Sequence, residues 1–221
     1  MIEATPEGRE AFILANTTLE RPPHTPELVL HLASEITPIW KLTEEALAEI
    51  GLPPPFWAFA WAGGQALARY VLDQPETVAG RGVLDFAAGS GIVGVAAARA
   101  GAARVLAADI DPFCGAAVAL NARANGVTLE FTAENLLDAP PPAWAEVILA
   151  GDICYEKPLA ERVMAWLRAA RAAGATVLIG DPGRSYFPRH GLEKLAEYQV
   201  PTTRELEDME VKKTSVWTLP E

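Results

Sequence analysis

The chain has 221 residues, of which 50% are hydrophobic and 21% are charged, a composition expected of one soluble globular domain. No apolar run is long enough to cross a bilayer, and two cysteines with three scattered histidines offer neither a disulfide framework nor a metal-binding cluster. The formal net charge of −11 argues against a nucleic-acid-binding surface and favours a partner with a basic surface.

The N-terminal part of the chain is expected to form a helical and extended cap segment, residues 1–61, of the same domain as residues 62–221. Prolines disfavour regular structure over 1–25. A Thr-Pro pair predicts a helix over about 25–34, and a Thr and a Gly bracket a second short helix over 43–51. The N-terminal sequence has neither a secretory nor a transit pattern, so we expect a cytoplasmic protein, and we expect it to be a monomer.

From residue 62 onward, helical and strand patterns alternate. The predicted helices cover 62–73, 91–100, 112–125 and 156–173, and the predicted strands cover 82–86, 104–108, 127–132, 146–150 and 175–180. This order predicts an α/β fold in which a parallel, doubly wound sheet carries helices on both faces. Two further strands, 197–200 and 211–218, have no helix between them and are expected to pair as an antiparallel C-terminal hairpin.

The first strand of this sheet runs into a glycine-rich turn. Residues 85–91 read Asp-Phe-Ala-Ala-Gly-Ser-Gly, so that Ala87, Ala88, Gly89 and Gly91 form a backbone turn that a ligand can approach closely. Asp109 ends the next strand, where the ribose diol of a nucleoside cofactor would lie.

The glycine spacing matches a dinucleotide fingerprint, but Asp85 favours a different cofactor. A carboxylate aimed at this turn would repel a pyrophosphate, whereas S-adenosylmethionine has no phosphate and carries a sulfonium and an ammonium group. The alternative is a strand–helix turn that binds no ligand.

Three further residues are candidates for the cofactor site. Ile110 is placed to pack on the adenine face, and Asn135 offers a donor and an acceptor to the adenine edge, unless it only forms a turn. Trp61 is expected to reach the cofactor from the edge of the first helix, within an aromatic run whose other members could simply seal the sheet.

The fourth strand ends in a segment suited to the methyl acceptor. It reads Gly151-Asp152-Ile153-Cys154-Tyr155, and we assign Gly151 to the cofactor side. Asp152 can hold an incoming ammonium by charge and hydrogen bond, and Tyr155 can add an aromatic face or a hydroxyl acceptor. The alternative is a helix cap beside a core aromatic residue.

Three more residues are assigned to substrate binding. Asp181 and Arg184 lie on a turn after the fifth strand, where they could contact the substrate or satisfy each other. Trp57 belongs to the aromatic run that precedes the first helix.

Seven segments together resemble one known family. They are Pro55-Phe56-Trp57, Trp61-Ala62-Gly63-Gly64-Gln65-Ala66-Leu67, 85–91, Ala108-Asp109-Ile110-Asp111-Pro112, 151–155, Ile179-Gly180-Asp181-Pro182-Gly183-Arg184 and Thr214-Ser215-Val216-Trp217. The family is that of the seven-β-strand protein-lysine methyltransferases, and the closest resemblance is to its electron transfer flavoprotein beta-subunit branch in a bacterial form. The resemblance runs from about residue 25 to the C-terminus. One departure is Ala87, where the family commonly has Gly.

The resemblance implies a class I, Rossmann-like methyltransferase fold that uses S-adenosylmethionine and releases S-adenosylhomocysteine. It implies methylation of lysines on the electron transfer flavoprotein beta subunit, with Asp152 and Tyr155 at the acceptor. The alternatives are a methyltransferase acting on a ribosomal protein or a small molecule, and a non-catalytic cofactor-binding module. Three converging acids, Asp85, Asp109 and Asp152, argue against the last.

Overall fold

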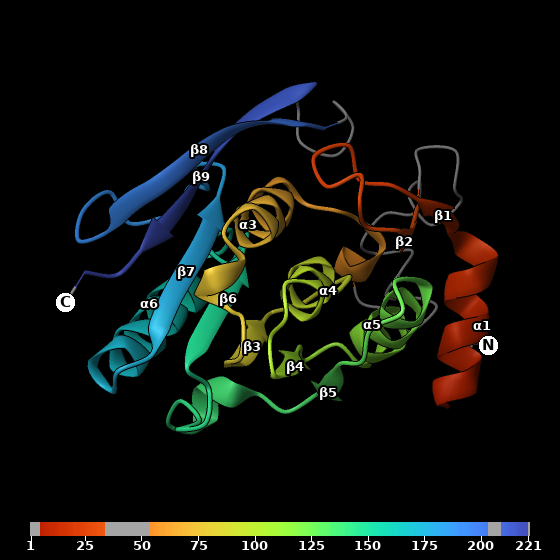
Figure 1. The fold of residues 1–221 in the computed structure, drawn as a ribbon, viewed down its shortest axis with the longest axis horizontal. Helices are drawn as coiled ribbons and strands as arrows, with labels where there is room; N and C mark the ends of the chain where they lie inside the picture. The colour runs from red at the N-terminus through yellow and green to blue at the C-terminus, as the bar shows by residue number, and fades with distance from the viewer. Residues whose placement is uncertain (1–4, 34–53, 203–208, 221) are drawn as a thin grey trace.

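The computed structural model describes residues 5–33, 54–202 and 209–220, and its centre is a seven-stranded sheet (Figure 1). The spatial order of the strands is β5-β4-β3-β6-β7-β9-β8. Their bounds are β3 (Gly82–Phe86), β4 (Arg104–Ala108), β5 (Glu130–Thr132), β6 (Val147–Gly151), β7 (Thr176–Asp181), β8 (Glu193–Pro201) and β9 (Val211–Thr218). Strands β3 to β7 pair in parallel, and β9 pairs antiparallel with both β7 and β8. The predicted parallel sheet with an antiparallel C-terminal hairpin is therefore confirmed.

The strand register brings the carboxyl ends of the parallel strands to one edge. Phe86 pairs with Ala108 on one side and with Ala150 on the other, and Gly151 pairs with Gly180. The residues that follow these positions therefore gather along this edge, which is where open α/β sheets bind ligands.

Helices cover both faces of the sheet. The main ones are α3 (Ala62–Asp73), α4 (Ile92–Arg99), α5 (Pro112–Ala124) and α6 (Lys157–Ala172). Val83 and Leu149 pack in the cluster that contains α3 and α4, whereas their neighbours Leu84 and Ile148 pack against α6. Because successive residues of a strand point to opposite faces, a strand covered on both faces is expected to be apolar throughout; β6 fits this rule, and β3 departs from it only at the buried Asp85.

The predicted bounds of these elements agree closely with the structure. The helix predicted over 62–73 and the strands predicted over 82–86, 104–108 and 211–218 have the same bounds as α3, β3, β4 and β9. The other predicted helices and parallel strands differ by one residue at one or both ends, except β5, which begins three residues later than predicted. The strand predicted over 197–200 is longer in the structure, where β8 begins four residues earlier. Short 3-10 turns, η2 (Phe56–Ala58), η3 (Pro75–Thr77) and η4 (Leu136–Asp138), connect the larger elements.

The N-terminal segment differs from the prediction. Helix α1 (Pro6–Asn16) occupies a stretch predicted to be irregular, with Thr5 capping it through a hydrogen bond from Gly8 N to Thr5 Oγ1. The helix predicted over 25–34 is wrong, because the chain there makes turns and strand β2 (Leu30–Leu32), which pairs with β1 (Thr18–Glu20). The helix predicted over 43–51 lies outside the described residues.

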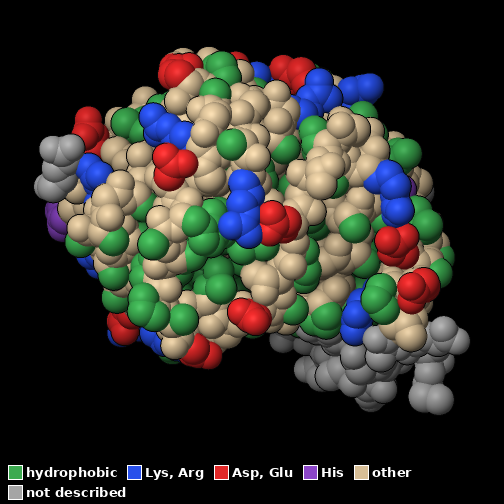
Figure 2. All heavy atoms as spheres, turned by 60° about the horizontal axis from the view of Figure 1, so that its bottom comes forward, with side chains coloured by type: hydrophobic (Ala, Val, Ile, Leu, Met, Phe, Trp, Pro, Cys, Tyr) green, Lys and Arg blue, Asp and Glu red, His purple; other side chains and the backbone are tan. Residues whose placement is uncertain are grey.

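Helix α1 packs against α5 at one end of the molecule, and β8 and β9 lie at the other end (Figure 1). On the face shown in Figure 2, Lys and Arg side chains lie singly among Asp and Glu side chains, and hydrophobic side chains gather in the lower left of the view. None of the helices in the described ranges is long and apolar enough to span a membrane.

Candidate active site

The turn after β3 has three residues in the left-handed region. They are Ala87 with φ 55°, Gly89 with φ 51° and Gly91 with φ 76°. A Cβ at Gly89 would lie 3.6 Å from Phe56 O, which is ordinary van der Waals contact, so the φ of Gly89 and not crowding favours glycine here. For Ala87 the left-handed conformation costs about 1–2 kcal/mol, and its methyl group is exposed at the site.

Asp85, on strand β3, is hydrogen-bonded to the helix that follows this turn. Its side chain is buried, with 1% of the residue exposed, and Oδ2 accepts a hydrogen bond of 2.8 Å from Gly94 N in the first turn of α4. Burial raises the pKa of Asp85 to about 8, because desolvation disfavours the charged form. Asp85 thus joins strand β3 to the first turn of helix α4.

Asp109 joins the same turn to the end of β4. Oδ2 accepts a hydrogen bond of 2.9 Å from Gly89 N, and Oδ1 accepts one of 3.0 Å from Asp111 N. Ile110 follows with 72% of its surface exposed, so an adenine ring has an apolar side chain to cover. Asn135 instead begins η4, where its side chain accepts from Leu137 N and donates to Asp138, which is the turn-forming alternative.

Asp152 lies at the end of β6 in an unusual backbone conformation. Its φ of 57° is left-handed, a region that Asp tolerates better than most residues, and its backbone N–H donates to Gly180 O. Its Oδ2 accepts a hydrogen bond of 2.9 Å from Gly64 N, one of the unpaired N–H groups in the first turn of α3. The helix N-terminus and this bond hold the carboxylate in place.

Helix α3 approaches the ends of β6 and β7 through glycines. A Cβ at Gly63 would collide with Gly180 O and would lie 2.6 Å from Asp152 Oδ2, and a Cβ at Gly151 would lie 3.0 Å from Gly64 Cα. Gly151 therefore serves this close packing. Gln65 follows, buried, and its Nε2 donates to Ala60 O while Oε1 accepts from His24 N, which ties the N-terminal segment to the helix.

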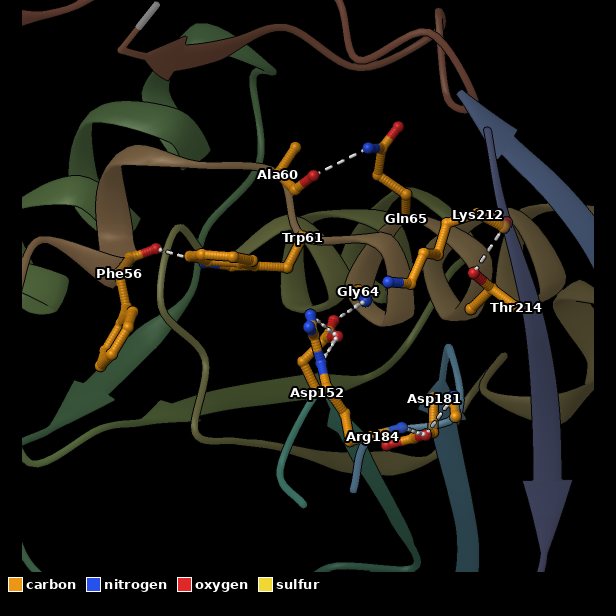
Figure 3. Close-up of polar contacts among 11 residues, drawn as sticks. Phe56, Ala60, Trp61, Gly64, Gln65, Asp152, Asp181, Arg184, Lys212 and Thr214 are labelled. Carbon is orange, nitrogen blue, oxygen red and sulfur yellow. Dashed lines mark hydrogen bonds and ion pairs between the residues drawn. The ribbon is translucent and has the colours of Figure 1, made fainter. Parts of the chain in front are cut away.

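Arg184 forms an ion pair with Asp152 (Figure 3). Its Nε and one terminal nitrogen both donate to Asp152 Oδ1, over 3.0 and 2.6 Å. Asp181 fixes the turn that carries Arg184, because its Oδ1 accepts from the backbone N of Gly183 at 2.6 Å and of Arg184 at 2.8 Å. Asp181 and Arg184 thus meet through the backbone, whereas the Arg184 side chain binds Asp152.

The second oxygen of Asp181 is in an unfavourable position. Only 2% of the residue is exposed, and Oδ2 has no hydrogen-bond partner among the described residues. Burial raises the pKa of Asp181 to about 7, and the neighbouring Asp152 adds to the increase, despite the backbone bond from Arg184.

The aromatic residues divide into a rim and a core. Trp61 Nε1 donates to Phe56 O at 3.0 Å, and the Phe56 ring lies 5.7 Å from that of Tyr155, which is 49% exposed. Trp57 is only 2% exposed and stacks on Phe113, so the substrate-binding role predicted for Trp57 is wrong and the residue belongs to the core.

Sequence reasoning assigned no role to Phe56, Gly63, Gly64 or Asn121. The Gly-Gly pair at the start of a helix was the available signal for the close approach to β6 and β7. Asn121 is a buried polar residue in the apolar helix α5, and it joins the turn to the N-terminal segment by donating to Ser90 O and accepting from His31 N.

The chain matches one family model, ribosomal protein L11 methyltransferase (PrmA), over residues 65–176. It is 40% identical to the electron transfer flavoprotein beta subunit lysine methyltransferase of Xenopus laevis, over 94% of this chain and 85% of that protein. The protein of the same name from Homo sapiens is 37% identical, over 94% of this chain and 80% of that one.

The chain belongs to the electron transfer flavoprotein beta subunit lysine methyltransferase family. The similarity extends beyond the shared middle region and includes the segments on both sides of it. S-adenosylmethionine is the methyl donor for this family, so the predicted cofactor is confirmed, and the chain is a methyltransferase.

The fold agrees with this assignment to the lysine methyltransferase family. The structure of magnesium protoporphyrin IX methyltransferase from Synechocystis PCC 6803 with bound S-adenosylmethionine superposes with a TM-score of 0.51 at 13% identity, over 71% of this chain and 78% of that one. At that identity the likeness shows the fold alone. The predicted class I methyltransferase fold is confirmed.

Proposed function

We propose that the chain transfers a methyl group from S-adenosylmethionine to the Nε atom of lysines on the electron transfer flavoprotein beta subunit. The observation that carries the proposal is Asp152, whose carboxylate is fixed between the N-terminus of α3 and the guanidinium of Arg184. It lies on the same sheet edge as the glycine-rich turn and already binds a cation. The names of the relatives supply the substrate.

The residues around the turn fit the cofactor. Gly89 has no Cβ between its backbone and a ligand, and Asp109 is positioned to accept from the ribose hydroxyls with its remaining lone pairs. Ile110 offers an apolar face to the adenine, and Ala87, Ala88 and Gly91 shape the turn. Burial raises the pKa of Tyr155, and the negative charge of Asp109 adds to the increase, so the Tyr155 phenol keeps its proton at neutral pH.

The bound donor supplies an electrophilic methyl group on a sulfonium. Once the methyl group is transferred, the sulfonium becomes a neutral thioether. The chain must therefore position the acceptor and shield it from water; it does not have to protonate a leaving group. Lysine has a reference pKa of about 10.4, so it arrives as an ammonium, and we assign Asp152 to bind and orient it. The lysine then loses its proton to water before its lone pair attacks.

The aromatic rim completes the acceptor site in this proposal. Trp61, Phe56 and Tyr155 present rings around the entrance, and rings of this kind both attract a cation and exclude water. We assign Trp61 to this side of the site, because its ring lies 5.7 Å from the guanidinium of Arg184. We further propose that the enzyme works as a cytoplasmic monomer and that residues before 62 cap the domain.

A lysate labelling experiment tests the substrate. The purified protein is incubated with radiolabelled S-adenosylmethionine and a lysate of the source cells, with heat-inactivated protein as the control. A single labelled band at the electron transfer flavoprotein beta subunit is expected. Label on small molecules would overturn the proposal.

A ribosomal protein is the second candidate substrate, because the matching family model is that of ribosomal protein L11 methyltransferase. The same gel decides between the two, since label on ribosomal proteins in place of the flavoprotein subunit would favour this alternative.

A further inference from the structure

One oxygen of the Asp152 carboxylate is bound by a side chain of the enzyme itself. Oδ2 accepts from the backbone of α3, while Oδ1 accepts two hydrogen bonds from Arg184. The two side chains are only 20% and 11% exposed, so the pair is shielded from competing water and salt. Arg184 therefore occupies the oxygen that an incoming lysine ammonium would use.

The surroundings of the guanidinium are those of a general cation site. Its central carbon lies 5.7 Å from the centre of the Trp61 ring, and Asp152 neutralises its charge. A carboxylate beside an aromatic face attracts any cation, and an ammonium satisfies the same two groups. An arginine and a lysine would compete here for one position.

The backbone of Arg184 is anchored, but its side chain has room to leave. Asp181 holds the turn by two short bonds to backbone N–H groups, so the start of the side chain stays in place. A cavity of about 360 Å³ borders Arg184, and Gly183, Arg189 and Trp217 are among its lining residues. The long Arg184 side chain therefore borders space into which it could move while its backbone stays fixed.

We propose that Arg184 is the resident cation of the acceptor site and that the substrate lysine displaces it from Asp152. This inference rests on the proposed function. Its consequence is specificity: a free amine must bear the full cost of breaking the Arg184–Asp152 pair, whereas a lysine on a protein surface gains additional contacts around the entrance that offset this cost. Arg184 is then the residue that excludes small cations.

Titration with n-butylammonium, which has the charge and length of a lysine side chain, tests this inference. The dissociation constant is measured by NMR at saturating S-adenosylhomocysteine, for the wild type and for Arg184→Gln. If Asp152 is free of Arg184 in about a tenth of wild-type molecules, the wild type binds about tenfold more weakly than a protein without the pair. Arg184→Gln should then lower the dissociation constant about tenfold. An unchanged or higher dissociation constant in Arg184→Gln overturns the inference.

Arg189→Gln is the matched control, because it removes an equal charge from an exposed position lining the same cavity. It is expected to leave the dissociation constant within about twofold of wild type, since an exposed charge is screened by salt. An equal gain in both variants would show a general charge effect and overturn the inference. If Arg184→Gln does not fold, Arg184→Lys replaces it. A smaller decrease in the dissociation constant is then expected, because lysine stays charged but cannot make the two hydrogen bonds that the guanidinium donates to Asp152.

The same proteins separate this inference from the proposed function. A wild type that methylates the flavoprotein subunit, together with an Arg184→Gln variant that gains no affinity for n-butylammonium, overturns the role of Arg184 alone. A wild type that methylates no protein lysine overturns the proposed function, and the inference with it.

Discussion

The two acid-bearing regions at the edge of the sheet are held in place in different ways. At the glycine-rich turn, Asp85 and Asp109 bind backbone N–H groups, which cannot leave without unfolding the turn. At the acceptor side, Asp152 binds a backbone N–H with one oxygen and the side chain of Arg184 with the other. The cofactor half is therefore built in advance, whereas the acceptor half is closed by a side-chain contact that can exchange.

The largest expected effect is at the acceptor half. Asp152→Asn removes the charge that orients the lysine but keeps an acceptor for Gly64 N, so methyl transfer should fall about 100- to 1,000-fold. Affinity for S-adenosylhomocysteine should not change. Glu156→Gln, which removes an exposed acid four residues further along, is the control. Full activity in a folded Asp152→Asn would contradict the role of Asp152.

The cofactor half should show the opposite pattern. Asp109→Asn replaces one acceptor oxygen with an amide that faces backbone N–H groups, and it removes charge-assisted bonds of about 1.5–3 kcal/mol. The dissociation constant of S-adenosylmethionine, measured by calorimetry, should rise by about tenfold or more. Asp111→Asn is the control: that side chain caps α5 and should change stability more than affinity. Equal losses in both variants would contradict the assignment.

Helix α3 packs closely against the ends of β6 and β7, and this packing can be tested by adding one methyl group to the helix. Gly63→Ala places a Cβ against Gly180 O and Asp152 Oδ2, and overpacking of this kind costs about 1–3 kcal/mol. The free energy of unfolding in urea measures the loss. Gly64→Ala is milder, because its Cβ would meet the side chain of Ile92 at 3.2 Å and no backbone atom, and it should retain more stability than Gly63→Ala.

The last expected effect concerns pH. The folded-state pKa values of Asp85 and Asp181 are raised to about 8 and about 7, above the unfolded value, so the folded state binds more protons over this range. Stability should therefore fall as pH rises from about 4 to 8. The free energy of unfolding should fall by at least about 1 kcal/mol. Each pKa unit by which the folded-state value exceeds the unfolded-state value corresponds to about 1.4 kcal/mol.

Asp181→Asn should flatten this decline and raise stability at pH 8, because the amide cannot ionise and so removes the cost of burying a carboxylate charge. Glu193→Gln, which removes an exposed acid, is the control. Equal slopes for Asp181→Asn and wild type in thermal unfolding would contradict the burial argument.

The parallel sheet was predictable because its signals are local. Apolar strands of five or six residues alternate with helices that begin and end at recognisable residues, and the acids stand directly after the strands. The N-terminal segment shows the limit of such signals. Thr5-Pro6 and Thr25-Pro26 are the same helix-start signal, yet only the first begins a helix.

At the second Thr-Pro pair the core overrides the local preference. Leu28, Leu30 and Leu32 are buried alternately, and the side chains of Asn121 and Asn125 on α5 bind the backbone of this stretch. Such bonds join residues about 90 positions apart, beyond the reach of a local pattern.

In the candidate site, the identities of the residues were predictable but their partners were not. Asp152 and Arg184 were both expected near the acceptor, while their pairing depends on the turn fixed by Asp181. Trp57 and Trp61 are four residues apart in one aromatic run, yet one enters the core and the other reaches the site edge. The boundary proposed at residue 61 stays a prediction.

The central claim is that Asp152 presents a protein lysine to a preformed cofactor site. The most direct test is tandem mass spectrometry of purified electron transfer flavoprotein beta subunit after incubation with S-adenosylmethionine and either wild type or Asp152→Asn. The account predicts methylated lysine with wild type and its near absence with Asp152→Asn, at equal cofactor affinity. An unmodified subunit with wild type, or equal methylation by both proteins, would contradict it.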